Sequence, residues 1–125
     1  MGAKELLCYL RKENKRIFLA TNGVANVQNR RLQETGMESF FENVYISEQL
    51  GYEKPDSKFF RYIFEDAKIL PQETIMVGDS LSSDILGGKN FGIDTIWFNP
   101  FRKMNTTDAV PTYEIKDLLE ISHVI

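Results

Sequence analysis

Residues 75–84 read Ile-Met-Val-Gly-Asp-Ser-Leu-Ser-Ser-Asp, a short apolar run that leads directly into two carboxylates, Asp79 and Asp84. The run from Thr74 to Val77 is compact and rich in β-branched residues, which predicts a parallel strand covered on both faces. Gly78 allows the chain to leave that strand sharply. The stretch therefore predicts a strand-to-helix turn that carries two acidic side chains.

Such a turn suits a magnesium ion. Asp79 is expected just past the carboxyl end of the strand, where open α/β sheets bind their ligands. Ser82 or Ser83 is expected to cap a helix from about Asp84 to Phe91, so that the second carboxylate lies in its first turn. Hard oxygen ligands beside a helix start favour magnesium together with phosphate. The alternative is that both aspartates are ordinary cap and turn residues.

Length and composition limit the function classes. A chain of 125 residues with 42% hydrophobic residues is enough for one domain, residues 1–125, with a real core. The net charge is -3 and the basic residues are mostly dispersed, so nucleic acid is not an expected partner. No apolar run approaches the roughly 20 residues that span a membrane, and no signal-peptide pattern is present, so a cytoplasmic protein is expected. The lone Cys8 is predicted to be a buried or half-buried thiol.

Helical and strand patterns alternate along the chain with short links, which indicates a layered α/β domain with a mostly parallel sheet. In the second helix Val24, Val27 and Leu32 are expected to face inward. The expected helices are residues 3–14, 24–35, 57–68, about 84–91 and 116–122, and the expected strands are residues 16–20, 43–46, 74–77, 93–98 and 113–115.

Polar residues follow the first strand at Thr21 and Asn22, immediately before a helix. A hydroxyl, an amide and the free backbone N–H groups of a helix start together make a site for a phosphate oxygen. Either residue could instead simply cap the helix.

Lys54 follows the second strand, and Pro55 stiffens the backbone beside it. This lysine could neutralise phosphate or the metal-binding carboxylates, or it could be a solvated surface residue. Three successive strand ends thus carry Thr/Asn, Lys and Asp/Asp, and all three are expected at one edge of a parallel sheet.

In these motifs the chain resembles the haloacid dehalogenase-like hydrolases, a superfamily of mainly magnesium-dependent phosphatases. Thr21 in Ala-Thr-Asn-Gly matches the second motif of the family, Lys54 in Glu-Lys-Pro-Asp the third, and Gly-Asp-Ser through Asp84 the fourth. The motifs occur in the family's order, and the resemblance extends from Gly2 to about Pro100. The chain looks most like the branch that includes pyrimidine nucleotide 5'-phosphatases.

The resemblance implies a Rossmann-like three-layer sandwich and roles for individual residues. Asp79 would ligate Mg²⁺ directly, and Asp84 would ligate it through water or orient Lys54. Thr21 and Asn22 would hold phosphate oxygens, and Lys54 would balance charge in catalysis. The implied substrate is a phosphorylated small molecule, with nucleotide 5'-phosphates as the candidates.

The first motif of the family, Asp-x-Asp, occurs nowhere in this sequence. In the family its first Asp is the nucleophile that forms an aspartyl-phosphate, and a helical cap follows it. The chain therefore resembles the C-terminal core portion of a larger hydrolase, and negligible turnover is expected from it alone. The alternative is a non-enzymatic binding or regulatory module. A phosphoacceptor signalling domain is disfavoured, because its acidic strand ends would precede Thr and Lys.

The resemblance also places the missing nucleophile strand centrally, between the strands that end near Thr21 and Asp79. Without it, either a gap or a new pairing of those two strands is expected. The chain alone is therefore predicted to be marginally stable, or to hide its exposed strand edges by homodimerisation or exchange of segments.

Overall fold

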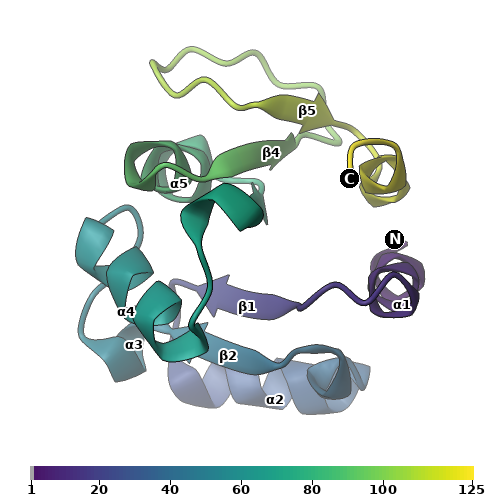
Figure 1. Ribbon diagram of the computed structural model, residues 1–125, viewed down its shortest axis with the longest axis vertical. Coiled ribbons are helices and arrows are strands. Elements are labelled where there is room, and N and C mark those ends of the chain that lie inside the picture. The colour runs from purple at the N-terminus through teal and green to yellow at the C-terminus, as the bar shows by residue number, and fades with distance from the viewer. Residues whose placement is uncertain (1) are drawn as a thin grey trace. The chain divides into compact units, whose positions relative to one another are not determined.

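The computed structural model describes residues 2–125, which divide into two compact units (Figure 1). The first unit contains the chain up to Glu53 together with Leu118–Ile125, and the second is Lys54–Asp117. The prediction of a single domain stays a prediction. Within the described residues, no helix is long and apolar enough to cross a membrane.

The first unit contains a pair of parallel strands. The strands β1 and β2 lie in register with Thr21 opposite Ile46. The first helix packs against the C-terminal 3₁₀ segment, so both ends of the chain belong to this unit (Figure 1). Its elements are α1 (Ala3–Lys12), β1 (Phe18–Thr21), α2 (Ala25–Thr35), η1 (Glu38–Phe40), β2 (Asn43–Ile46), α3 (Ser47–Leu50) and η4 (Leu118–His123).

Three predictions for this unit are wrong. Val24 and Val27 are 50% and 46% exposed, and Leu32 is the one buried residue of α2. The helix is largely polar and packs against η1, so it needs little apolar surface. Cys8 is exposed, because Leu6 and Leu7 supply the buried face of α1. The last predicted helix, residues 116–122, is the 3₁₀ segment η4 rather than an α-helix.

The second unit is built on three parallel strands. The sheet order is β3–β4–β5, with Gly78 opposite Trp97 and Phe98 opposite Ile115. Every strand pair in both units is parallel, so the predicted α/β class with a parallel sheet is confirmed. The elements are α4 (Ser57–Ala67), η2 (Pro71–Glu73), β3 (Ile75–Gly78), the π-helical turn η3 (Leu81–Ile85), α5 (Leu86–Phe91), β4 (Asp94–Phe98) and β5 (Tyr113–Ile115).

Helix α4 supplies much of the core of the second unit. The Asp56 carboxylate caps it by accepting a hydrogen bond of 2.9 Å from the Lys58 N–H. Its buried residues are Phe59, Phe60, Ile63, Phe64 and Ala67, which lie on the apolar face of the helix. Helix α4 packs closely on α5, where a Cβ at Gly87 would lie 2.6 Å from the Phe60 ring.

Strand β3 is not covered on both faces. None of its residues is fully buried, and Val77 is 39% exposed. The reason is its place at the edge of the β3–β4–β5 sheet, where β4 is its neighbour on one side.

Candidate functional site

The loop after β3 is ordered by a serine that the sequence analysis did not select. Asp79 is the first residue after the strand, and its side chain is exposed. Ser80 caps the following π-helical turn, because its Oγ accepts a hydrogen bond of 3.2 Å from the Ser83 N–H. The expected cap at Ser82 or Ser83 is therefore wrong. The helical turn starts at Leu81, so the cap position falls at Ser80.

Asp84 and Lys54 form a buried ion pair. The Lys54 Nζ donates to the Asp84 Oδ1 at 2.5 Å, and each side chain is 8% exposed. The Asp84 Oδ2 accepts a further hydrogen bond of 3.3 Å from the Ser80 N–H. Lys54 is therefore not a solvated surface lysine, and its ammonium is held beside the loop that carries Asp79.

The tight approach of Asp84 to the strand end depends on a glycine. A Cβ added at Gly78 would overlap the Asp84 carboxylate. Only a residue without a side chain lets this carboxylate lie against the end of β3 while it holds Lys54.

A buried tryptophan, missed by the sequence analysis, contacts the same loop. The Trp97 Nε1–H of β4 donates to the backbone carbonyl of Asp79 at 3.2 Å. Trp97 is 4% exposed and forms a small core with Ile85 and Ala109. The signal for this contact is the register, which places Trp97 opposite Gly78, and register is not visible in one sequence.

Thr21 and Asn22 lie in the first unit, at the end of β1. Thr21 is half-buried and Asn22 is exposed. Neither occupies the N-cap position of α2, which belongs to Val24. Neither of the two polar residues therefore caps α2 at that position.

The start of α2 is less open than expected. The Gly23 N–H donates to the Ser47 Oγ at 3.1 Å, and the Ala25 N–H donates to the Glu48 Oε1 at 2.9 Å. Two backbone donors that were expected to face a phosphate are therefore bound by side chains of α3. This short helix was not predicted, and neither Ser47 nor Glu48 was selected from the sequence.

The carboxylates suit magnesium only in part. Among residues 2–125, no group of three or more His, Cys, Asp or Glu side chains is placed to hold a metal ion. Asp79 offers an exposed carboxylate at a strand end, whereas both oxygens of Asp84 accept hydrogen bonds from protein groups. Mg²⁺ commonly takes one or two carboxylates and completes its shell with water and phosphate oxygens, so Asp79 fits as one ligand.

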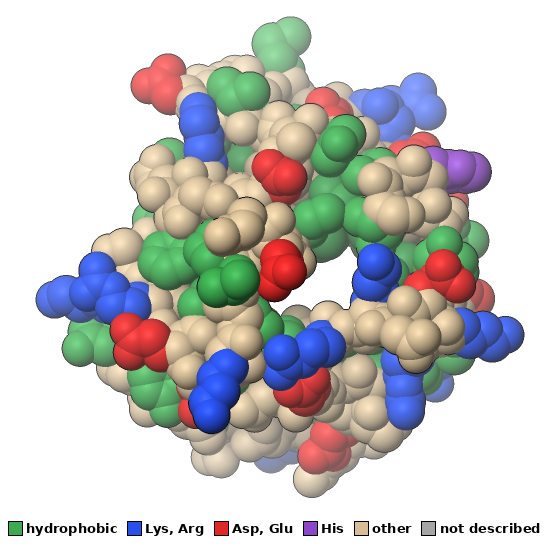
Figure 2. Space-filling model, in the orientation of Figure 1, with side chains coloured by type: hydrophobic (Ala, Val, Ile, Leu, Met, Phe, Trp, Pro, Cys, Tyr) green, Lys and Arg blue, Asp and Glu red, His purple; other side chains and the backbone are tan. Residues whose placement is uncertain are grey.

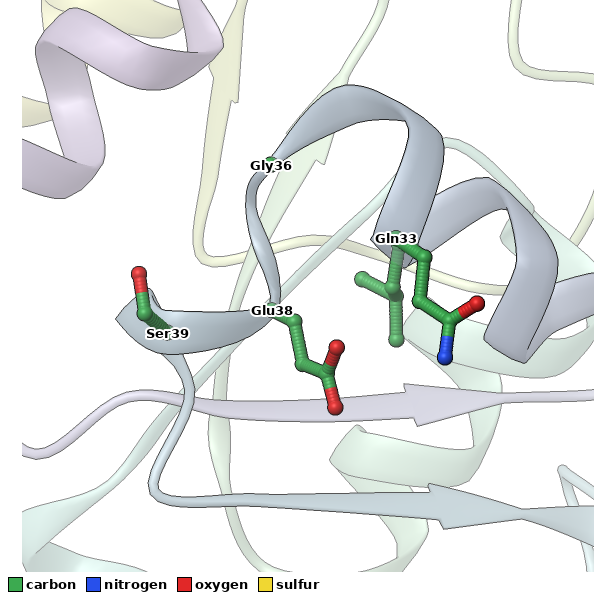
Figure 3. A pocket seen from close by; sticks show the side chains of 5 residues that line it. Gln33, Gly36, Glu38 and Ser39 are labelled. Carbon is green, nitrogen blue, oxygen red and sulfur yellow. The ribbon is translucent and has the colours of Figure 1, made fainter.

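A hollow of about 410 Å³ in the first unit lies away from the predicted motifs. It is lined by the end of α2 and by η1, and none of its lining residues is a predicted site residue. Figure 3 shows Gln33 and Glu38 directed to the same side of this hollow.

Acidic and basic side chains are interspersed over the face seen in Figure 2, in keeping with 18 acidic and 15 basic residues.

Comparison with known proteins identifies the family of the chain. The sequence profile of the haloacid dehalogenase-like hydrolases matches residues 1–98. The pyrimidine 5'-nucleotidase PynA of Streptococcus pneumoniae is 45% identical over 123 residues, which are 95% of this chain and 52% of PynA. The pyrimidine 5'-nucleotidase YjjG of Escherichia coli is 37% identical over 125 residues, which are 99% of this chain and 55% of YjjG. The chain spans about half the length of these relatives.

Solved structures show the same Rossmann-like fold. YfnB of Bacillus subtilis, crystallised with bound magnesium, superposes with a TM-score of 0.94 at 39% identity, over 98% of this chain and 54% of YfnB. A HAD phosphatase of Thermococcus onnurineus gives a TM-score of 0.89 at 31% identity, over 96% of this chain and 54% of that structure. The predicted fold and family are confirmed, and the chain belongs to the haloacid dehalogenase-like hydrolases.

Proposed function

We propose that this chain carries metal- and phosphate-binding residues of a Mg²⁺-dependent phosphate monoester hydrolase whose substrates are nucleotide 5'-phosphates. The observation that carries the proposal is the buried Lys54–Asp84 pair beside Asp79. Two relatives that match nearly the whole chain are named as pyrimidine 5'-nucleotidases, which supports the substrate class.

Lys54 would balance negative charge during phosphoryl transfer. A lysine in a buried ion pair has a fixed ammonium position, whereas a solvated lysine samples many rotamers. Asp84 supplies that fixation through Oδ1, while the Ser80 N–H holds Oδ2. Of the two roles considered for Asp84, orientation of Lys54 therefore has direct support from its contacts.

Asp79 would be a ligand of the metal. Its exposed carboxylate at the end of β3 can reach an ion in the adjoining solvent. Bound Mg²⁺ would neutralise charge on the phosphate oxygens and orient them.

Thr21 and Asn22 would bind phosphate oxygens. The Thr21 hydroxyl and the Asn22 amide are suitable donors at the end of a parallel strand. The N–H groups of Gly23 and Ala25 already donate to the side chains of Ser47 and Glu48. The phosphate oxygens would therefore be bound by Thr21, Asn22 and the backbone immediately beside them.

The chain would not turn over substrate alone. Its sequence holds no Asp-x-Asp motif, and neither metal nor Lys54 replaces a carboxylate nucleophile. We therefore assign this chain the binding part of the site and place the nucleophile outside residues 1–125. The alternative is a binding module without catalysis.

A complementation experiment distinguishes the binding part of a catalytic site from a binding module without catalysis. Hydrolysis of p-nitrophenyl phosphate and of pyrimidine nucleoside 5'-monophosphates with Mg²⁺ is measured for the chain alone and mixed with the N-terminal half of PynA. PynA's own two halves serve as the control. We expect turnover only from the mixture, and loss of that turnover on Lys54→Ala. Turnover by the chain alone that Asp79→Ala abolishes would contradict its inactivity. If the mixture shows no hydrolysis while the two halves of PynA do, the result supports a binding module without catalysis.

A further inference from the structure

We infer that Trp97 is a positioning residue for the Asp79 carboxylate, an inference that rests on the proposed role of Asp79 as a Mg²⁺ ligand. Trp97 is the single tryptophan of the chain, and the proposed chemistry does not use its side chain. Its indole N–H nevertheless donates a hydrogen bond to the backbone carbonyl of Asp79, a proposed site residue.

The contact joins two neighbouring strands at their carboxyl ends. Trp97 lies on β4 opposite Gly78, and its Nε1–H reaches one residue further, to the Asp79 carbonyl at 3.2 Å. The indole is 4% exposed and packs with Ile85 and Ala109, so its donor has a fixed direction. A rigid group of the sheet thus holds the first peptide of the loop.

Asp79 needs such a restraint. It follows Gly78, whose backbone is freer than that of any residue with a side chain. The bonds of Asp84 and Ser83 to Ser80 restrain the far side of the loop. The Trp97 bond restrains the near side, at Asp79 itself. A ligand carboxylate held in one orientation binds its metal more tightly, because less freedom is lost on binding.

A purely structural role makes a different prediction. Buried tryptophans commonly find a partner for the indole N–H, and Trp97 would then matter only for packing and stability. Trp97→Phe keeps an aromatic ring in the core and removes the donor. Ile96→Val is the matched control, because it removes one methyl from a fully buried residue of the same strand, and the aliphatic side chain of Ile96 has no donor for the Asp79 carbonyl.

Metal affinity distinguishes these roles without an activity assay. The dissociation constant of Mn²⁺ is measured on the full 125-residue chain by the electron paramagnetic resonance of free Mn²⁺. Loss of one hydrogen bond predicts a roughly two- to ten-fold weaker constant for Trp97→Phe. Ile96→Val is expected to leave the constant unchanged while lowering the melting temperature. A Trp97→Phe constant equal to that of the unmodified chain would overturn the inference.

Asp79→Asn separates failure of the inference from failure of the proposed function. Loss of Mn²⁺ binding in Asp79→Asn is expected. If Asp79→Asn binds Mn²⁺ as the unmodified chain does, the metal assignment fails and the inference fails with it. If Asp79→Asn loses binding and Trp97→Phe does not, only the inference fails.

A measurement on the unmodified chain covers the case in which Trp97→Phe does not fold. One tryptophan gives one indole signal in a ¹⁵N–¹H correlation spectrum, which can be followed without assignment of the backbone. We expect saturating Mg²⁺ to slow hydrogen exchange of this N–H several-fold, and Asp79→Asn to abolish the effect. An exchange rate that Mg²⁺ leaves unchanged, in a chain that binds the ion, would contradict the coupling.

Discussion

At the scale of single residues, we expect Lys54 and Asp84 to be strongly coupled in their contributions to the free energy of unfolding. Removal of one partner leaves the other buried charge without this ion pair, which costs about 3–5 kcal/mol, whereas removal of both costs much less. Each side chain of the pair is 8% exposed, so solvent gives little compensation. We expect Lys54→Met and Asp84→Asn each to lower the free energy of unfolding strongly, and the double variant to lose far less than their sum. Urea unfolding of the four proteins measures this, and additive losses would argue against coupling.

Gly78→Ala tests the close approach of Asp84 to the end of β3. A Cβ there would overlap the carboxylate, so Asp84 and Lys54 must move, at a cost of about 1–3 kcal/mol in unfolding free energy. Gly23→Ala is the matched control, because the nearest atom to its Cβ is the mobile amide end of Gln28. Calorimetric melting should show a clear loss for Gly78→Ala and little for Gly23→Ala. Equal losses would assign the effect to glycine flexibility alone.

The exposed Arg16–Glu42 pair predicts a small pH effect. The hydrogen bond from Arg16 lowers the pKa of Glu42 below its ordinary value. A lowered folded-state pKa contributes stability above the unfolded pKa, and this contribution is lost as the pH falls through the folded value. We expect the NMR titration midpoint of the Glu42 carboxyl to rise in Arg16→Gln. An unchanged midpoint would show that the pair does not persist in solution.

The elements were predictable where the hydrophobic pattern alone decides them. The bounds of β2 and β5 agree with the sequence pattern, and α4 forms within the predicted residues 57–68. The predictions failed where packing decides. Val27 has helical spacing but is exposed on α2, and Val77 is exposed because β3 is an edge strand. Which face finds a partner is a tertiary property.

Gly87→Ala tests the packing of α4 on α5. The new Cβ would lie 2.6 Å from the Phe60 ring and 3.0 Å from the Pro55 backbone, which cannot both give way without separating the helices. We expect a loss of about 1–3 kcal/mol, although alanine has the higher helix propensity. Lys89→Ala, at an exposed position of the same helix, should leave stability nearly unchanged. Chemical denaturation compares the two, and a stabilised Gly87→Ala would show that α5 shifts freely.

At the scale of the whole molecule, the motif order was enough to predict the family but not the contacts within the site. Lys54, Asp79 and Asp84 are identified by residue type and by their place after strands. The bond from Trp97 to Asp79 and those from the start of α2 to Ser47 and Glu48 join segments 18 to 24 residues apart. Such bonds depend on register and loop geometry, for which a single sequence has no periodic signal.

The strand edges of the two units lead to the last prediction. Within residues 2–125, β1 is paired with β2, and β3 ends the order β3–β4–β5. An edge strand presents unpaired backbone groups, which are a template for another chain. We propose that the chain self-associates through the edge of β3, where Val77 is 39% exposed.

Sedimentation across a range of protein concentrations tests this proposal. Val77→Lys should weaken self-association, because a charged side chain opposes pairing at a strand edge. Val110→Lys is the control, since Val110 is 63% exposed but lies in the loop between β4 and β5, outside any strand. A monomer at every concentration would refute the proposal. Equal weakening by both variants would indicate general repulsion rather than pairing at β3, because each adds one positive charge and only one of them lies on the edge.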